Sequence, residues 1–426
     1  MNVMILGGGG RESALARKLS QCPQLTALYI APGNAGTEQY GQNIAVAVDD
    51  FAGIAQVCRD KAIDLLVVGP EMPLINGVAD YIDKHAPATR VFGPRQSAAR
   101  LEGSKAYAKA FMCRHGVPTA EYIAVCDDNM SAGANFIMKG QGPYVLKADG
   151  PAAGKGTLIV PRTLDAVREL RTMLAGKFGQ ASYNVVIERF LKGPECSVFV
   201  ITDGRGNYRT LPVAMDYKRA LDGDRGLNTG GMGAISPVPH ADEEFRRRID
   251  QRIVRPTLAG LMAEDIDYRG VIYFGVINVD GDPYLLEYNV RFGDPESSSV
   301  FARTGGNLLS VLMRAASGDL AEDLAADDDL TNLPVSAVTV VAIAGGYPLY
   351  YHRGMEITGN LDPADAIVLH AGTARNDEGK TVVAGGRVLD VVGIADTLDE
   401  ARKKSYEALG GIHFADMAFR TDIGAL

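Results

Sequence analysis

Two oxygen-bearing side chains stand two positions apart in Tyr284 to Val290, a segment that reads as a strand. Glu287 and Asn289 should therefore point to one face, and carboxylate and amide oxygens are ligands that Mg²⁺ prefers. Arg291 continues along that face and Asp294 follows in the next loop. A cation beside a bound metal stabilises a phosphoryl group during transfer. The spacing predicts phosphoryl-transfer chemistry; a surface ladder of charges is the alternative, against which the apolar neighbours argue.

A loop of small residues runs from Lys147 to Gly156 and contains a second lysine, Lys155. It matches a Walker motif only superficially, because Asp149 stands where that motif has glycine and Gly156 where it has serine or threonine. What remains, with Gly154 among its glycines, is a loop whose two lysines can fold over a triphosphate and neutralise it. A solvated glycine loop without a ligand is the alternative.

An earlier glycine run, Gly7 to Gly10, follows an apolar segment and leads into Arg11 and Glu12. A dinucleotide-binding loop has glycine where this chain has Glu12, and the second strand ends in Ala31-Pro32 without an acidic residue for a ribose. A nicotinamide or flavin cofactor is therefore not expected. Backbone N–H groups at a helix start can seat a phosphate, and Arg11 adds a charge suited to a phosphate monoester. A tight packing turn is the alternative.

Two further carboxylates flank a turn in the middle of the chain. Glu188 ends the apolar run that begins at Val185, and Glu195 follows a few residues later. Glu188, beside exposed backbone groups, could accept an adenine amino group, and Glu195 could bind ribose hydroxyls. Taken alone, Glu188 also fits an ordinary surface charge.

The elements that position these residues fall into three regions. In residues 1–103, short apolar runs alternate with helical patterns and end in turn signals, which predicts a doubly wound α/β domain with its loops at the carboxyl ends of the strands. Open sheets of this type bind ligands there. The expected strands are Val3 to Leu6, Ala27 to Ile30, Asp64 to Val68, and Val91 to Phe92.

Residues 104–329 contain the lysine loop and a hairpin that pairs Val271 to Val279 with Tyr284 to Val290 across Asp280-Gly281-Asp282-Pro283. An acidic stretch, Glu322 to Asp329, predicts a solvated boundary. In residues 330–426, strands are expected at Val335 to Ile343, Ala366 to His370 and Val388 to Val392. The last helix should begin at the capping box Thr397 to Glu400 and end near Gly410.

Composition excludes several functional classes. A chain of 426 residues with 46% hydrophobic content can bury several cores, and a net charge of −9 leaves no basic stripe for nucleic acid. The amino terminus lacks the features of a signal peptide, and no segment has the roughly 20 apolar residues of a membrane helix, so we expect a cytoplasmic enzyme. The 5 cysteines lack CxxC spacing, and the 6 histidines form no triad-like pattern with serine or cysteine.

Eight motifs occur in an order that resembles one family over essentially the whole chain, the glycinamide ribonucleotide synthetases. These motifs are Gly8-Gly9-Arg11-Glu12; Gly69-Pro70-Glu71 with Pro73-Leu74; Glu102-Gly103-Ser104-Lys105; the 147–156 loop; Asn228-Thr229-Gly230-Gly231-Met232-Gly233; Arg291-Phe292-Gly293-Asp294-Pro295-Glu296; His370-Ala371-Gly372-Thr373; and Gly385-Gly386-Arg387-Val388.

The resemblance implies an ATP-grasp fold, with an amino-terminal doubly wound α/β domain (1–103), an ATP-grasp domain (104–329) whose lid is about 124–192, and a carboxyl-terminal α+β domain (330–426). It implies that ATP is held by Lys105, Lys147, Gly154, Lys155, Gly156, Glu188, Leu191 and Glu195, and Mg²⁺ or Mn²⁺ by Glu287 and Asn289. The substrate residues it implies are Gly8, Gly9, Arg11, Glu71, Lys218, Asn228, Gly230 and Gly231, and the catalytic residues are Arg291, Asp216 and Asp294.

The implied reaction is attack of the glycine carboxylate on the γ-phosphate of ATP, followed by attack of phosphoribosylamine on the acyl phosphate, with lid closure excluding water. The partners are thus small molecules, without nucleic acid or membrane; no oligomeric state is implied. The chain departs from the family pattern at Ser13, Ala214, Met215, Tyr217, Leu227, Ile235, Ser297 and Ser298, positions that we expect around the acyl and acceptor sites. A paralogue using the same chemistry on another amino acid or amine is therefore a second hypothesis. A catalytically silent ATP-binding regulator is a third, against which the intact lysine, metal and arginine positions argue.

Overall fold

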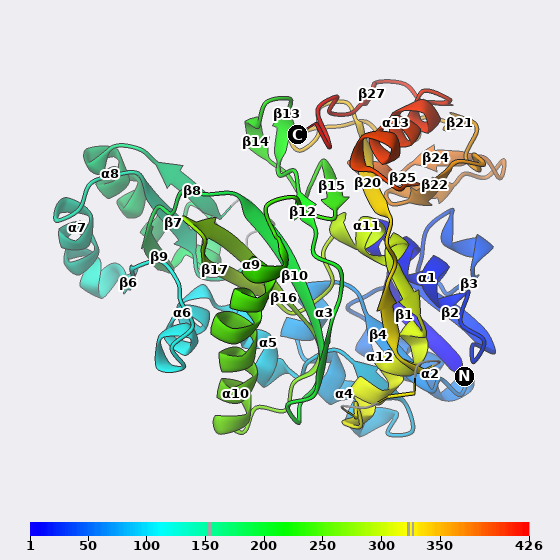
Figure 1. Ribbon diagram of the computed structural model, residues 1–426, viewed down its shortest axis with the longest axis horizontal. Helices are drawn as coiled ribbons and strands as arrows, with labels where there is room; N and C mark the ends of the chain where they lie inside the picture. The colour runs from blue at the N-terminus through cyan, green and yellow to red at the C-terminus, as the bar shows by residue number, and fades with distance from the viewer. Residues whose placement is uncertain (152–155, 322–323, 326–327, 426) are drawn as a thin grey trace.

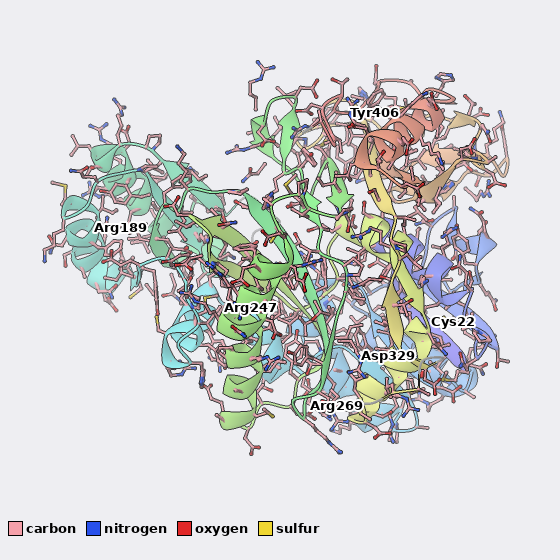
Figure 2. All side chains as sticks on the ribbon, viewed as in Figure 1. Cys22, Arg189, Arg247, Arg269, Asp329 and Tyr406 are labelled. Atoms are coloured by element: carbon pink, nitrogen blue, oxygen red, sulfur yellow. The ribbon has the colours of Figure 1, made fainter. Side chains whose placement is uncertain are left out.

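The computed structural model describes residues 1–151, 156–321, 324–325 and 328–425. Its elements form an amino-terminal parallel sheet, a lid, a central antiparallel sheet and a carboxyl-terminal sheet (Figure 1). The lid projects on one side of the molecule, while the amino- and carboxyl-terminal parts lie on the other. Side chains fill the space between these elements (Figure 2).

The first sheet has the order β3-β2-β1-β4-β5 and its strands are parallel. All four strands expected from the sequence are present, because their continuous apolar runs suit strands that are covered on both faces. The strands are β1 (Asn2–Gly7), β2 (Ala27–Pro32), β3 (Gln42–Asn43), β4 (Leu65–Val68) and β5 (Arg90–Phe92). The connecting helices are α1 (Gly10–Leu19), η1 (Thr37–Gln39), α2 (Phe51–Asp60), α3 (Glu71–Ile75) and α4 (Val78–His85), followed by α5 (Gln96–Gly103) and α6 (Lys105–Arg114).

The region expected to form the lid, and called the lid below, is a four-stranded antiparallel sheet of order β6-β9-β7-β8 with its own core. Leu146 and Ile187 from the strands pack with Leu170 from a helix in this core. The elements are β6 (Tyr122–Cys126), η2 (Asp127–Asn129), α7 (Met130–Met138), β7 (Tyr144–Ala148), β8 (Thr157–Val160), α8 (Thr163–Leu174), η3 (Gly179–Ser182) and β9 (Asn184–Arg189). The core of this region is therefore separate from the other hydrophobic cores.

The central sheet has the antiparallel order β11-β10-β16-β17 and contains the expected hairpin. Asp280 and Gly281 both have positive φ, which gives a two-residue turn of the type that favours right-twisted hairpins. The strands are β10 (Glu195–Asp203), β11 (Tyr208–Thr210), β16 (Arg269–Val279) and β17 (Asp282–Asn289). Helices α9 (Glu243–Ile249) and α10 (Arg255–Ala263), joined by the π-helix η4 (Asp250–Val254), precede β16.

The carboxyl-terminal sheet, β12-β15-β20-β25-β22, takes two strands from the middle of the chain. These are β12 (Met215–Asp216) and β15 (Gly233–Ser236), which join β20 (Ser336–Ala344), β25 (Arg387–Ala395), β22 (Ala366–His370) and, paired to β20, β27 (Met417–Ala418). The three strands expected in this region are confirmed. Helix α13 (Leu398–Leu409) has Thr397 as N-cap and Gly410 as C-cap, also as expected.

The remaining elements connect these layers. They are the hairpin β13 (Arg219–Leu221) and β14 (Arg225–Asn228), α11 (Glu296–Ala302), β18 (Thr304–Gly306), α12 (Leu308–Ser317), β19 (Leu330–Asn332), β21 (Thr358–Gly359), β23 (Thr373–Arg375), β24 (Thr381–Val383) and β26 (Ile412–His413). The expected acidic boundary, Glu322 to Asp329, lies partly outside the described residues. Within the described part of the chain, every helix is too short or too polar to cross a bilayer.

Candidate active site

Glu287 and Asn289 lie at the end of β17, as the two-residue period predicts. Burial by itself raises the pKa of Glu287, but the positive charges of Lys147, Lys218 and other nearby cations outweigh it and lower that pKa. Glu287 therefore stays ionised at neutral pH. Its carboxylate and the Asn289 amide give this end of the strand two hard oxygen donors.

Asn289 is buried, and its Nδ2 has no hydrogen-bond partner within the described residues. Its Oδ1 accepts only a long hydrogen bond, from Arg291 Nη2 at 3.4 Å. An amide held in a buried position with so little engagement, next to an ionised carboxylate, fits the requirements of a magnesium ligand pair. Within the described residues, no three His, Cys, Asp or Glu side chains lie close enough together to hold a metal ion.

Arg291 connects this strand to the amino-terminal region. Its Nε lies 3.5 Å from Glu71 Oε2 and its Nη2 lies 3.6 Å from Glu102 Oε1. Glu102 in turn accepts a hydrogen bond from the Val290 amide at 2.7 Å. Burial lowers the pKa of Arg291, but the charges of Glu102 and Glu71 outweigh burial and raise that pKa above its ordinary value. The guanidinium therefore stays charged. Arg291 is thereby fixed in direction beside the two oxygen donors.

Glu188 is a buried carboxylate between two lysines, and its interpretation as a surface charge is wrong. Only 2% of the residue is exposed. Lys147 Nζ lies 2.7 Å from Oε1, and Lys109 Nζ lies 2.9 Å from Oε2. Both oxygens are thus opposite ammonium groups rather than free for an adenine amino group. The carboxylate fixes Lys147, whose Nζ also donates to the Leu286 carbonyl at 3.2 Å.

The loop after β7 is anchored to the start of helix α6. Asp149 Oδ1 accepts hydrogen bonds from Ser104 Oγ at 2.9 Å and from the Ala106 amide at 2.7 Å. Lys105, the first residue of α6, donates its amide to the Asp149 carbonyl, while Nζ has no partner within the described residues. At the other end of the loop, the Gly156 carbonyl accepts from the Ala148 amide at 2.8 Å. Two expected site residues, Gly154 and Lys155, lie outside the described residues.

A third set of charges lies where β10 meets β12. Lys218 Nζ lies 2.6 Å from Glu195 Oε2 and 3.8 Å from Asp216 Oδ1. Burial raises the pKa of Asp216 to about 7. The charge of Lys218 lowers that pKa, while the charges of Glu296 and Glu195 raise it. Asp216 thus titrates near neutrality beside a cation. Leu191, expected with Glu195 in the same site, is partly buried in the segment between β9 and β10.

The loop 228–233 follows hairpin β13–β14 and packs on the turn at Asp294. Gly231 has φ +119°, and a Cβ there would lie 2.4 Å from Pro295 Cδ, so glycine is required for this approach. Asn228, at the end of β14, pairs with Arg219. Gly230 is held by carboxyl-terminal side chains, Tyr347 and Arg387.

The glycine run at the start of α1 faces the same turn. The Gly9 amide donates to Glu12 Oε2 at 2.6 Å, and a Cβ on Gly9 would lie 3.1 Å from Asp294 Oδ2. Gly8 packs against the Gly33 carbonyl. Arg11 was expected to add a charge suited to a phosphate; its guanidinium is buried and paired with Glu12 at 2.6 Å.

Most positions that depart from the family pattern are buried rather than exposed to a substrate. Ser13, Ser297, Ser298 and Ala214 are 1%, 1%, 3% and 0% exposed, and Ile235 is also fully buried. Their expected location around the acyl and acceptor sites stays a prediction. The Ser13 hydroxyl donates to the His370 carbonyl, Ser297 to the Gly293 carbonyl and Ser298 to Asp390. Met215 is partly buried against two hydrophobic cores, and Leu227 is exposed.

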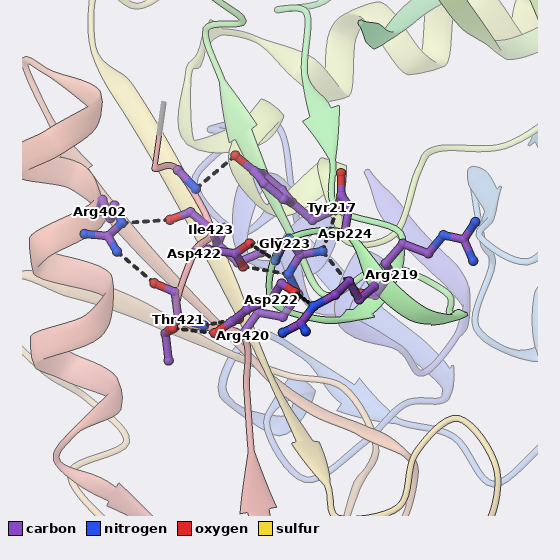
Figure 3. Close-up of polar contacts among 12 residues, drawn as sticks. Tyr217, Arg219, Asp222, Gly223, Asp224, Arg402, Arg420, Thr421, Asp422 and Ile423 are labelled. Carbon is purple, nitrogen blue, oxygen red and sulfur yellow. Dashed lines mark hydrogen bonds and ion pairs between the residues drawn. The ribbon is translucent and has the colours of Figure 1, made fainter. Parts of the chain in front are cut away.

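Tyr217 lies on the opposite face of the chain from Asp216 and Lys218. Figure 3 shows its hydroxyl directed at the carboxyl-terminal segment, where it accepts a hydrogen bond from the Gly424 amide at 3.0 Å. The Arg420 guanidinium lies over its ring, 5.2 Å from the centroid. The Tyr217 side chain therefore packs against the carboxyl-terminal segment.

Sequence reasoning missed several residues that contact the site. Lys109, Tyr347 and Asp390 belong to no motif on which the site was built, and each reaches it from a distant element. Glu102 and Arg387 did occur in family motifs, but no local spacing assigned them a contact. Their partners lie 188 residues away for Glu102 and 157 for Arg387, so only the fold brings them together.

Family models cover most of the chain in three consecutive pieces. Models of the phosphoribosylglycinamide synthetase N domain, ATP-grasp (A) domain and C domain match residues 1–102, 103–297 and 337–426. The phosphoribosylamine–glycine ligase of Vibrio vulnificus strain CMCP6 is 41% identical over 430 residues, covering 100% of this chain and 98% of the relative. The enzyme of the same name from Escherichia coli O6:H1 is 41% identical over 432 residues, again with 100% and 98% coverage.

Solved structures agree with this result. A crystal structure of phosphoribosylamine–glycine ligase from Thermotoga maritima superposes with a TM-score of 0.84 at 35% identity, covering 99% of this chain and 100% of that one. The biotin carboxylase domain of Hydrogenobacter thermophilus 2-oxoglutarate carboxylase has a TM-score of 0.74 at 17% identity, with 98% and 91% coverage. The second likeness concerns the fold alone.

Proposed function

Since this chain belongs to the phosphoribosylglycinamide synthetase family, we propose that it joins glycine to 5-phosphoribosylamine with ATP, giving glycinamide ribonucleotide, ADP and phosphate. It is an ADP-forming carboxylate–amine ligase with an ATP-grasp fold, and the reaction belongs to purine biosynthesis. The observation that carries the proposal is convergence on Glu287: Lys147 from the lid, Lys218 and Arg291 all lower the pKa of that one carboxylate.

The proposed nucleotide site lies between the lid and the central sheet. Lys105 and Lys147 neutralise the phosphates, together with Gly154, Lys155 and Gly156 of the loop, while the Leu191 segment meets the base and Glu195 the ribose. Glu188 acts through Lys147, since its oxygens are already paired. Glu287 and Asn289 hold Mg²⁺, or Mn²⁺ in its place, because both offer hard oxygen donors. When bound, the metal neutralises charge on the transferring phosphoryl group.

We propose that two positively charged residues and one acidic residue act on the reacting groups. Arg291 stabilises the developing charge on the phosphoryl oxygens, because Glu71 and Glu102 hold its guanidinium in place. Lys218 orients the glycine carboxylate. Asp216, whose pKa is raised to about 7 by burial, accepts the proton that the amine loses.

The ribosyl phosphate of the acceptor is proposed to lie near the amino-terminal glycine run. Gly8 and Gly9 bring backbone close to the sugar phosphate, and Arg11 braces Glu12 behind them. Glu71 meets ribose hydroxyls, and Asn228, Gly230, Gly231 and Asp294 border the amine. We propose a cytoplasmic reaction with small-molecule partners only, and domain limits of 1–103, 104–329 and 330–426 with a lid of about 124–192.

The alternative of a paralogue with another amino acid or amine receives no support from the relatives. The buried departures Ser13, Ser297 and Ser298 form hydrogen bonds with other protein groups, and Ala214 is fully buried, which supports the family's own substrates. The regulator hypothesis is disfavoured by the retained Glu287 environment.

The test is ADP release with ATP, Mg²⁺ and freshly formed phosphoribosylamine, comparing glycine with a panel of other amino acids and replacing the acceptor with other amines. We expect glycinamide ribonucleotide, identified by mass, as the product formed at enzymic rates. Preference for another donor or acceptor would establish the paralogue instead, and nucleotide binding without turnover on any amine would establish the regulator.

A further inference from the structure

The backbone of Gly230 is held on both of its polar groups by side chains from the carboxyl-terminal region. The Gly230 amide donates a hydrogen bond to the Tyr347 hydroxyl at 2.9 Å. Its carbonyl accepts one from Arg387 Nη1 at 2.7 Å. Tyr347 lies in the turn after β20, and Arg387 begins β25, which pairs with β20 in the carboxyl-terminal sheet.

The same guanidinium also holds the turn that faces Gly230. Arg387 Nη1 donates to the Asp294 carbonyl at 2.7 Å and lies 3.2 Å from Asp294 Oδ1. Burial lowers the pKa of Arg387, but the charge of Asp294, followed by Tyr347 and Asp390, raises it, so the side chain keeps its charge. One arginine thus fixes the loop 228–233 and the Asp294 turn relative to each other.

Glycines make this arrangement possible at two positions. A Cβ on Gly230 would lie 3.0 Å from Arg387 Cζ, so the backbone lies directly against the guanidinium group. A Cβ on Gly386 would lie 2.3 Å from Tyr347 Cδ2, which means that only glycine lets the tyrosine ring take its position. The loop, the ring and the guanidinium therefore form one packed unit.

The strands beside the loop belong to the same sheet. β15, which starts at Gly233, pairs with β20 in register Gly233 to Val340. The Met232 carbonyl accepts a hydrogen bond from the Val341 amide at 3.0 Å, and the Met232 amide donates to the Tyr217 carbonyl at 2.7 Å. Asp216 and Lys218 on one side of the hairpin, and the loop on the other, are consequently carried by the carboxyl-terminal sheet.

We propose that Tyr347 and Arg387 are positioning residues of the ligase: they hold the loop 228–233 against Asp294 in the geometry needed for glycine and the amine to react. This inference rests on the proposed function and gives the carboxyl-terminal region a role in it. Neither residue needs to touch ATP. We call the contacts of Tyr347 and Arg387 with the loop 228–233 the clamp. Loss of the clamp should therefore impair the reaction of the acyl and amine substrates and leave nucleotide binding unchanged.

The first variant is Tyr347→Phe, which removes the acceptor of the Gly230 amide and keeps the ring that packs on Gly386. Tyr351→Phe is the matched control, because its ring lies beside that of Tyr347, with centroids 6.2 Å apart, while among the described residues its hydroxyl accepts only from Arg353. The second variant is Arg387→Lys, which keeps a positive charge near Asp294 and loses the geometry that serves two carbonyls.

Both clamp variants should fold, since the hairpin β13–β14 has a separate attachment (Figure 3). Arg420 Nη1 donates to the Arg219 carbonyl at 3.0 Å and to Asp224 Oδ1 at 2.9 Å, and the Thr421 amide donates to Asp222 Oδ1 at 2.8 Å. Thermal unfolding checks this directly.

We expect Tyr347→Phe to lower kcat/KM for glycine and for the amine by about five- to tenfold, the effect of one lost hydrogen bond, with an unchanged KM for ATP. Amide hydrogen exchange in 228–233 should become faster in Tyr347→Phe and Arg387→Lys and stay unchanged in Tyr351→Phe. Equal behaviour of Tyr347→Phe and Tyr351→Phe in both measurements overturns the proposal, as does a loss that is equally large in the KM for ATP.

The exchange measurement needs no substrate, so it separates the two questions. If the native protein fails to ligate glycine, the proposed function fails, and the exchange comparison still decides whether the clamp exists. If native ligation is normal and the exchange of 228–233 is unaffected by the variants, the clamp alone is rejected.

Discussion

Lys109 lies against Glu188 with 2.9 Å between Nζ and Oε2, although the two residues come from α6 and from the lid. The other oxygen of the carboxylate faces Lys147 at 2.7 Å. Burial lowers the pKa of Lys109 to about 8. The charge of Glu188 raises that pKa, and the charge of Lys147 lowers it. A single buried carboxylate therefore compensates two ammonium groups at the base of the lid.

Replacing Glu188 by Gln should destabilise the lid strongly. The two lysines would lose the carboxylate that pairs with both of them and keep only the influence of Glu287, which costs on the order of 3–5 kcal/mol. We expect faster amide exchange in β7 and β9 and a lower melting temperature. Adding Lys109→Met to Glu188→Gln should restore part of the loss, because it removes one of the unpaired charges. Unchanged exchange in the lid strands of Glu188→Gln would rule out this role.

Glu287 gives a prediction about catalysis rather than folding. Glu287→Gln keeps the shape of the side chain but removes the charge that surrounding cations hold ionised. ADP release should fall at least about a hundredfold, because the lost interaction acts on charge that develops during transfer. Asp282→Asn on the same strand is the control, since Asp282 pairs with Arg252 on the surface. A glutamine variant with near-normal turnover would show that Glu287 is not a metal ligand.

Local patterns predicted the geometry of Glu287 and Asn289 well. Their common face follows from the two-residue period of a strand, and the turn at Asp280 and Gly281 follows from residues that accept positive φ. The parallel sheet and its loops were likewise predictable, because buried parallel strands are continuous apolar runs. These features depend only on residues close together in the chain.

Contacts between distant segments were not predictable in this way. Nothing near Glu188 indicates that Lys109, 79 residues earlier, will neutralise it. Nothing near Gly233 indicates that β15 pairs with β20, about a hundred residues later, rather than with the central sheet. The placement of Tyr217 is an intermediate case. Asp216 and Lys218 face the site, so strand alternation alone would have directed Tyr217 away from it.

Tyr217 therefore supplies a test of the substrate assignment. Tyr217→Phe removes the hydroxyl that accepts from the Gly424 amide at 3.0 Å, and should cost about 1 kcal/mol of stability. The KM values for glycine and the amine should stay within about twofold of the native values, because the side chain faces the carboxyl-terminal segment. Steady-state kinetics and thermal unfolding measure both quantities. A large change in either KM would return this position to the substrate pocket and favour the paralogue.

Asp390 predicts a pH dependence of stability. The residue is 1% exposed; Ser298 donates to Oδ2 at 2.8 Å, and Oδ1 has no partner within the described residues. Burial raises the pKa of Asp390 to about 7 from an ordinary 3.8; the charges of Asp294 and Glu296 add to this, and Arg387 and the Ser298 hydrogen bond oppose it. The folded protein thus favours the neutral acid.

The sign of the effect follows from proton binding. Between pH 4 and pH 7 the folded protein keeps a proton on Asp390 that the unfolded chain has released. The contribution of Asp390 to stability therefore falls as the pH rises and is constant above about pH 7.

Asp390→Asn imitates the neutral acid and does not titrate. Its melting temperature relative to the native protein should therefore rise from pH 4 to pH 7 and then level off, with a stability advantage on the order of 4 kcal/mol at pH 8. Asp216, which also titrates near pH 7, is present in both proteins and cancels in the difference. A difference that stays flat with pH, or that falls between pH 4 and pH 7, would mean that Asp390 is ionised in the folded protein and that Arg387 outweighs its burial.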